Sequence, residues 1–461
     1  MWSKEFFKSL MNLGIPRHMI QRAKIGFQDL WNPLKIIFQQ NSIPKNGWKD
    51  AQIRMLLKIL SSFDSDKDIK AIRIGEREAR TSSPILNEIA SGFCHGIGRS
   101  GDLTAPQPKA AGASLMQALC NRLMLSLVNN LGIVNVKGAL STPMGTGMSL
   151  AMALRGLFNY YETNIQDKNG VLYPRADHKS PPKGINFVGG KIIQVEGHFG
   201  ENHFAPEGAY VDIEDIKSTY FENKNKISSI VSTTSFFAPR VPDEIKEIAK
   251  FADEYNLIHV INNAYGIQSE ILIKKIRSAI DAGRVDAIIQ SNDKNFLTPV
   301  GGGVILSPKE EIIEAISSCY AGRASATPTI QLLVSLLSMG LGGYQKQMKK
   351  QTKNMKLLNN KLQNLAESMG ERVIDCKNPI SCAMTLRSLD KDLIADLGGY
   401  LYNLRVTGPR VVNVYEKDFG ACTDEIRTPY VVMNAAIGVK RKDIMKSKNL
   451  LEKAIRQLKK N

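Results

Sequence analysis

A lysine in a short polar segment is the first residue of this chain that could do covalent chemistry. Lys294 lies in Ser291–Phe296, directly after the apolar run Ala287–Ile289 and before the glycine-rich stretch Gly301–Gly303. Among side chains, only a primary amine forms a Schiff base with an aldehyde cofactor. We therefore predict that Lys294 is a Schiff-base residue, with an ordinary exposed loop lysine as the alternative for this motif alone.

Two residues earlier in the chain could contact the ring of such a cofactor. Asn262 ends the apolar run Ile258–Ile261, where it would face a ring nitrogen, and His178 in Tyr173–Ser180 could stack on the ring. A neutral amide holds a ring nitrogen protonated less firmly than a carboxylate does. We therefore expect a weak electron sink, which suits loss of a good β-leaving group better than formation of a long-lived carbanion.

A run of small residues adds a candidate anion site. Ser141–Ser149 contains Gly145 and Thr146, follows an expected strand and opens an expected helix. The free N–H groups and the positive dipole of a helix N-terminus favour a bound phosphate. Together with the three residues above, in this chain order, the run is typical of fold-type-I pyridoxal-phosphate enzymes, and pyridoxal 5'-phosphate is the cofactor that we predict.

A second glycine-rich segment, residues 96–109, could hold a phosphate that does not belong to the cofactor. Its donors are Arg99, Ser100, Gln107 and Lys109, and such groups bind phosphate oxygens well. The segment lacks the GxxxxGK[ST] spacing of a nucleotide P-loop. A purely structural turn is the alternative interpretation.

The elements that must position these residues follow from hydrophobic periodicity. Residues 1–65 have apolar residues at helical spacing, with a turn at Ile43–Trp48 and a polar connector at Asp64–Asp68, and we expect a helical N-terminal extension. Residues 66–330 alternate short apolar runs with helical stretches, which predicts an α/β domain with a doubly wound sheet. Residues 331–461 begin with a long helix and predict a small α+β domain.

The expected elements inside these two parts can be given by their bounds. Expected parallel strands of the sheet are Ile185–Val188, Ile227–Val231, Ile258–Ile261 and Ala287–Ile289, with a helix at Pro242–Tyr255. Expected strands of the last part are Ala383–Leu386, Arg410–Val414 and Tyr430–Met433, followed by a closing helix.

Composition favours a protein that binds RNA. The formal net charge is +17, and cations gather in residues 1–60, on one helical face in residues 346–356, and in the last twenty residues. Three such clusters favour a polyanionic partner, although a solvated face could explain each alone.

No apolar run is long enough for a membrane span, and six scattered cysteines suit a reduced, cytoplasmic protein. We expect no metal site: His198 and His203 predict a polar loop, and His259 a core histidine.

Several long motifs together resemble the O-phosphoseryl-tRNA(Sec) selenium transferase family, from about residue 43 to the C-terminus. The motifs that carry the resemblance are Gly75–Glu78, Gly98–Asp102, Gln107–Gly112, Ser232–Pro242, Asn262–Gly266, Asp293–Phe296 and Gly322–Ser325. The resemblance implies that the chain is a fold-type-I pyridoxal-phosphate transferase acting on tRNA(Sec) charged with O-phosphoserine. Phosphate would leave the β-carbon, and selenophosphate would supply selenium to form selenocysteinyl-tRNA(Sec).

The same resemblance implies roles for individual residues. Arg99, Ser100, Gln107 and Arg323 would hold the substrate phosphate, with Arg323 reaching in from another subunit, because guanidinium groups neutralise a departing dianion. Arg77 would contact the cofactor. Glu76 would repel free amino acids, since only they carry an α-carboxylate. Arg405 would contact the tRNA, and the protein would be a homotetramer.

Other functions remain open at this point. The first is another enzyme of the same fold, either a sulfur-transferring phosphoseryl-tRNA enzyme or a small-molecule decarboxylase or lyase. The second is a tRNA-binding protein without catalytic activity. The joint presence of Lys294, Arg99, Gln107 and Arg323 argues against the second, and the absorbance of a Schiff base would exclude it.

Overall fold

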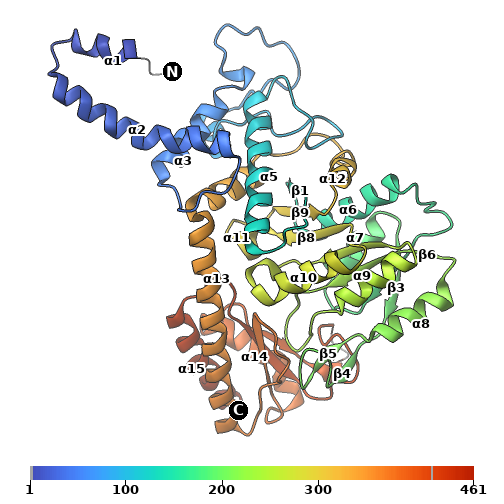
Figure 1. Ribbon diagram of the computed structural model, residues 1–461. Helices are drawn as coiled ribbons and strands as arrows, with labels where there is room; N and C mark the ends of the chain where they lie inside the picture. The colour runs from blue at the N-terminus through green and yellow to red at the C-terminus, as the bar shows by residue number, and fades with distance from the viewer. Residues whose placement is uncertain (1–3, 417–418, 461) are drawn as a thin grey trace.

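A seven-stranded sheet forms the centre of the protein, for which a computed structural model describes residues 4–416 and 419–460. The strand order is β1-β9-β8-β7-β6-β2-β3 (Figure 1). The strands are β1 (Gly138–Thr142), β2 (Gly170–Pro174), β3 (Lys191–Val195), β6 (Ile227–Thr233), β7 (Ile258–Asn262), β8 (Ala287–Ser291) and β9 (Gly303–Ser307). All pairs are parallel except those of β9, which is antiparallel to both of its neighbours.

Helices cover both faces of this sheet. Every residue of β1, β2, β7, β8 and β9 is buried, and side chains alternate between the two faces of a strand. The helices of this part are α4 (Pro84–Ile89), α5 (Ala111–Leu131), α6 (Thr146–Tyr160), α7 (Ser180–Phe187), α8 (Ile213–Asn223), α9 (Ile245–Glu254), η2 (Gly266–Gln268), α10 (Glu270–Ala282), α11 (Asn292–Phe296) and α12 (Glu310–Ser317).

Three of the four strands expected in the sheet are confirmed, and one is wrong. The runs at 227–231, 258–261 and 287–289 lie in β6, β7 and β8, and the expected helix at 242–255 is α9. The run Ile185–Val188 instead ends helix α7, which has proline in its first turn. Proline presets φ for a helix start, and so short an apolar run has no period that distinguishes a strand from a buried helix.

The N-terminal segment is helical, as predicted: α1 (Lys4–Met11), α2 (Arg17–Gln40) and α3 (Asp50–Ser61). Residues 1–3 of the expected extension lie outside the described residues, as do 417–418 and 461. In Figure 1, α1 and α2 extend away from the rest of the molecule. Among the described residues, no helix combines the length and the apolar character needed to cross a membrane.

The expected polar connector Asp64–Asp68 begins with a buried residue, which local sequence did not indicate. Residues 65–67 form the short helix η1 (Ser65–Lys67), and Asp64 is only 1% exposed. Its Oδ1 accepts the N–H groups of Gly112 at 2.8 Å and Ala113 at 3.1 Å. These donors lie in the first turn of α5, where N–H groups have no partner inside the helix. Asp64 therefore does for α5 what a capping residue does.

The C-terminal part is a three-stranded antiparallel sheet with its own core. Its strands are β10 (Ser381–Thr385), β11 (Arg410–Val412) and β12 (Tyr430–Asn434), in the order β10-β12-β11. The strands expected in this part overlap these three. A separate apolar cluster joins the sheet to α13 (Thr327–Met369), α14 (Lys391–Asn403) and α15 (Arg441–Leu458), and η3 (Val414–Glu416) follows β11.

The long helix α13 is broken at Gly340, and the turn near residue 45 forms hydrogen bonds with backbone groups on both sides of the break. Gly340 has a φ of 59°, which interrupts the helical hydrogen bonds. The N–H groups of Leu341 and Gly342 donate to the carbonyls of Pro44 at 2.8 Å and Lys45 at 2.9 Å. On the other side of the break, the Trp48 N–H donates to the Leu337 carbonyl at 2.8 Å. Backbone groups that the break leaves unpaired are thus satisfied by an N-terminal segment.

Candidate active site

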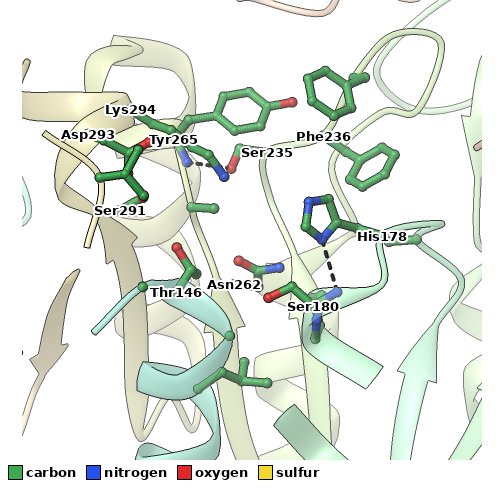
Figure 2. A pocket seen from close by; sticks show the side chains of 18 of the residues that line it. Thr146, His178, Ser180, Ser235, Phe236, Asn262, Tyr265, Ser291, Asp293 and Lys294 are labelled. Carbon is green, nitrogen blue, oxygen red and sulfur yellow. Dashed lines mark hydrogen bonds between the residues drawn. The ribbon is translucent and has the colours of Figure 1, made fainter. Parts of the chain in front are cut away.

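A cavity of about 240 Å³ lies at the carboxyl ends of the central strands. Figure 2 shows Lys294, His178, Asn262 and Thr146 around it. These residues follow or end four different strands, β8, β2, β7 and β1, so the sheet brings together what the chain keeps far apart. The carboxyl edge of an open α/β sheet is where such folds bind ligands.

Lys294 lies in the first turn of the short helix α11. Its side chain lines the cavity, and the surrounding protein lowers the pKa of its ammonium group, opposed by the charge of Asp293. The Asp293 carboxylate is itself bound by the Ser291 hydroxyl. A lowered pKa increases the fraction of neutral amine, which is the form that attacks an aldehyde.

Asn262 ends strand β7 with its side chain buried against the cavity. Its exposure is 7%, and its Oδ1 has no hydrogen-bond partner among the described residues. A buried, unpaired carbonyl oxygen costs about 1–3 kcal/mol. A ring N–H of a bound cofactor would satisfy this oxygen, so Asn262 fits the pyridine ring of pyridoxal phosphate.

His178 presents a neutral ring to the cavity. Its Nδ1 accepts the Ser180 N–H at 3.2 Å, which leaves the proton of the neutral ring on Nε2. The ring packs edge-to-face on Phe236, with centroids 6.4 Å apart. Burial, together with the charges of Lys294 and Arg410, lowers the pKa of His178. An uncharged, oriented ring is suited to stacking on a pyridine ring.

The N-terminus of α6 provides the anion site. Gly145 is its N-cap residue and Thr146 its first residue, and both line the cavity. The space in front of Gly145 is open, because a Cβ built there meets no atom within 4 Å. Gly147 is closely packed, since a Cβ there would lie 2.0 Å from Ser180 Oγ. The cofactor phosphate therefore fits at this helix end.

Six of the seven other predicted site residues form a second group. In the described part of the chain, none of Glu76, Arg77, Arg99, Ser100, Gln107 and Arg323 lines the cavity. The backbone joins two of their segments: the Ile97 N–H donates to the Ala324 carbonyl at 3.0 Å, and the Gly101 N–H to the Gly322 carbonyl at 3.2 Å. Arg99, Ser100 and Arg323 therefore belong to one surface.

Arg323 is the most constrained member of this group. Its Nη2 donates to the His95 carbonyl, and its Nε is buried without a partner among the described residues. Burial, and then the neighbouring charge of Arg77, lowers the pKa of Arg323. The exposed Arg77 also lies 3.4 Å from the Glu76 carboxylate. Two adjacent guanidinium groups make this surface suitable for an anion.

Arg405 lies in neither group. It follows α14 with a φ of 63° and lines a separate cavity of about 620 Å³ between the C-terminal sheet and α15. The structure therefore separates the predicted tRNA contact from the cofactor cavity.

Sequence reasoning missed the aromatic wall of the cavity and two of its serines. Phe236, Phe237 and Tyr265 line it, as do Ser180 and Ser235. The Ser235 hydroxyl accepts the Tyr265 N–H at 3.1 Å. The run that contains Ser235 and Phe236 is visible in the sequence only as a family motif, because aromatic residues alone do not indicate a binding wall.

The histidines outside the cavity have structural partners. His259 is buried, as expected, and its ring bonds Ser232 Oγ and the Arg284 carbonyl, both at 2.8 Å. His198 lies in a small hairpin of β4 (His198–Gly200) and β5 (Gly208–Tyr210) rather than in an irregular loop. Its Nε2 is 2.6 Å from Asp215 and its Nδ1 is 3.0 Å from Glu425. Residues 4–416 and 419–460 contain no group of ligands suited to a metal ion.

Comparison with known proteins identifies the family. The model of the O-phosphoseryl-tRNA(Sec) selenium transferase family, SepSecS, matches residues 63–456. The O-phosphoseryl-tRNA(Sec) selenium transferase of Methanococcus maripaludis is 43% identical over 445 residues, which are 96% of this chain and 98% of that protein.

Solved structures agree with this match. A crystal structure of an archaeal O-phosphoseryl-tRNA(Sec) selenium transferase superimposes with a TM-score of 0.88 and 43% identity, covering 95% of this chain and 98% of that one. A structure titled Oryza sativa TDC with PLP has a TM-score of 0.59 at 11% identity, covering 96% and 98%, which shows the shared fold alone. The predicted fold class, that of the fold-type-I pyridoxal-phosphate enzymes, is confirmed, and the chain belongs to the O-phosphoseryl-tRNA(Sec) selenium transferase family.

Proposed function

We propose that this protein converts O-phosphoseryl-tRNA(Sec) to selenocysteinyl-tRNA(Sec) with selenophosphate, using pyridoxal phosphate. The observation that carries the proposal is the convergence of Lys294, Asn262, His178 and the α6 N-terminus on one cavity. Selenium transferases are 43% identical to this chain over nearly its full length. This similarity favours selenium over sulfur as the element transferred, and it argues against a decarboxylase or a non-catalytic protein.

The residues of the cavity have distinct tasks in this proposal. Bound pyridoxal phosphate supplies an electron sink that acidifies the α-carbon of an attached amino acid. Lys294 would hold the cofactor aldehyde, and its amine is the group that would take up the α-proton of the substrate. Asn262 would contact the ring nitrogen, His178 would lie against the ring, and the N–H groups at Gly145 and Thr146 would bind the cofactor phosphate.

The second group of residues would act on the substrate phosphate in a partner's cavity. Arg99, Ser100, Gln107 and Arg323 do not line the cavity of their own chain. Nearby, Ile69, Ile72 and Ile74 are 98%, 91% and 92% exposed, as expected of side chains that a partner covers. These features support a homotetramer in which Arg77 contacts a neighbouring cofactor and Glu76 excludes free amino acids.

A basic surface supports binding of the tRNA body. The lysines of the expected basic face, residues 346–356, are exposed on α13, and α15 packs against the same helix. Arg405 at the neighbouring cavity would contact the acceptor end. In the proposal, residues 1–65 form a tRNA-binding and oligomerisation extension, 66–330 the cofactor domain and 331–461 a small domain. A substrate of this kind places the protein in the cytoplasm, where its six free thiols would persist.

The test is conversion of phosphoseryl-tRNA(Sec) in the presence of selenophosphate by wild type, Lys294→Ala and the control Lys309→Ala. Lys309 is an exposed lysine at the N-cap of α12, away from the cavity. We expect selenocysteinyl-tRNA(Sec) from wild type and Lys309→Ala only. A wild type that binds pyridoxal phosphate but forms no product, with selenophosphate or with a sulfur donor, would refute the proposed reaction.

A further inference from the structure

The segment that carries His178 is held by the residue before it. Asp177 is buried, with an exposure of 6%. Its carboxylate accepts the Arg175 Nε–H at 3.1 Å, and its Oδ2 accepts two N–H groups of the C-terminal part, from Gly420 at 3.1 Å and Cys422 at 2.8 Å. In return, the Asp177 N–H donates to Cys422 Sγ at 3.3 Å. One residue thus joins the cavity wall to a segment some 240 residues away along the chain.

The backbone around Gly420 is shaped to hold this carboxylate. Cys422 has a φ of 66° and Gly420 a φ of 151°, and a non-glycine residue with positive φ costs about 1 kcal/mol or more. Both N–H groups point to one oxygen, which is the geometry of a backbone anion site. The strained backbone is therefore retained together with a specific buried anion, the Asp177 side chain.

Further contacts fix the position of segment 419–425 relative to the cavity. Thr423 Oγ1 donates to the Gly197 carbonyl at 2.6 Å. Arg410, whose charge lies near His178, donates to the Phe419 carbonyl at 3.0 Å and packs over the ring of the cavity residue Phe237, 5.4 Å from its centroid. Docking of the segment and shaping of the cavity wall therefore occur together.

We propose that Asp177 is a positioning residue: it transmits the docking of segment 419–425 to His178 and so sets how firmly the cofactor ring is held. The inference rests on the proposed function only in taking pyridoxal phosphate as the occupant of the cavity. Asp177 is not among the residues that line the cavity and need not touch the cofactor. Loss of its carboxylate should loosen the stacking ring without removing any group that contacts the ligand.

The experiment measures the Kd of pyridoxal phosphate for the apoenzyme and the visible circular dichroism of the bound cofactor. Asp177→Asn keeps the size of the side chain but replaces one acceptor oxygen by an NH₂ group, which cannot accept the N–H groups that surround it. The control Glu196→Gln removes another carboxylate that Arg175 contacts, at 2.8 Å, and leaves Asp177 intact. We expect Asp177→Asn to raise the Kd about tenfold and to halve the dichroism, and Glu196→Gln to change neither by more than about twofold.

A second variant tests the same contact from the other side. Gly420→Ala places a Cβ at a φ of 151° and 2.2 Å from Arg410 Nη2. It therefore disturbs both the backbone that presents the two N–H groups and the contact of Arg410 with segment 419–425. It should reproduce the weaker binding and smaller dichroism even if Asp177→Asn does not fold. Wild-type Kd and dichroism in the folded variants would overturn the inference, as would an equal effect of Glu196→Gln. If wild type binds the cofactor but makes no selenocysteinyl-tRNA(Sec), the proposed function fails, and the same binding data still decide the role of Asp177.

Discussion

The buried carboxylate of Asp64 leads to a prediction whose size can be worked from the structure. Burial raises its pKa from an ordinary 3.8 to about 6, despite the N–H groups of Gly112 and Ala113. The folded protein therefore holds this proton more tightly than the unfolded chain, so stability is lost as pH rises from 3.8 to 6. At 1.36 kcal/mol per pKa unit, the free energy of unfolding falls by about 3 kcal/mol in all. About 2 kcal/mol of this loss occurs between pH 4.5 and 7.5.

Asp64→Asn should remove this pH dependence. The amide oxygen can still accept the two N–H groups, while its NH₂ replaces Oδ2, which has no partner among the described residues. An unpaired NH₂ costs about 1–3 kcal/mol at every pH. At pH 7.5 the two proteins should therefore have similar free energies of unfolding. Between pH 4.5 and 7.5, however, the free energy of unfolding of the variant minus that of wild type should rise by about 2 kcal/mol.

The assay is urea unfolding of both proteins at several pH values, followed by fluorescence. Asp68→Asn is the matched control, because the exposed Asp68 carboxylate accepts, among the described residues, only the Lys70 N–H at 2.9 Å. Its removal should give a flat difference. A difference that is equally flat for Asp64→Asn, or that moves against the variant as pH rises, would refute the reasoning. It would mean that the charge at the start of α5 stabilises the helix more than burial penalises it.

Three further predictions concern the charge clusters and the cavity. Asp215 and Glu425 raise the pKa of the partly exposed His198, so its small contribution to stability is complete below pH 6.5 and is lost as pH rises through the folded pKa. The unfolding midpoints measured at pH 5.5 and 8.5 should therefore differ less for His198→Gln than for wild type. Gly147→Ala should weaken pyridoxal phosphate binding several-fold because its Cβ meets Ser180 Oγ at 2.0 Å, and adding Ser180→Ala should restore binding in a fluorescence titration. Asn262→Asp should hold the ring nitrogen protonated, so a long-wavelength absorbing species should accumulate with substrate; an unchanged spectrum and rate would contradict the weak-sink interpretation.

Chain order revealed much of the cofactor cavity, because Thr146, His178, Asn262 and Lys294 each follow or end a strand. The runs at 258–261 and 287–289 are apolar and have no neighbouring proline, and the strands that they predict place Asn262 and Lys294 at one edge of the sheet. The run at 185–188 failed because its neighbouring prolines outweigh its apolar character.

Long-range contacts could not be predicted in the same way. Asp64 reads as a polar connector, because nothing local shows that α5 will place two N–H groups beside it. The bond between Asp177 and Cys422 joins residues that only the folded chain brings together. The surface that contains Arg99 and Arg323 depends on backbone bonds between distant loops, and its predicted contact with a phosphate stays a prediction.

The sealed break in α13 bears on how this chain could be shortened. A fragment that begins after residue 48 would leave the N–H groups of Leu341 and Gly342 and the carbonyl of Leu337 unpaired in the middle of a helix. The carbonyl of the buried Leu337 would cost about 1–3 kcal/mol if left unpaired, and both halves of α13 would lose their hydrogen bonds to the N-terminal segment. The minimal folding unit therefore starts upstream of Pro44, and the N-terminal helices can be removed only up to the segment at residues 44–48 that bonds α13.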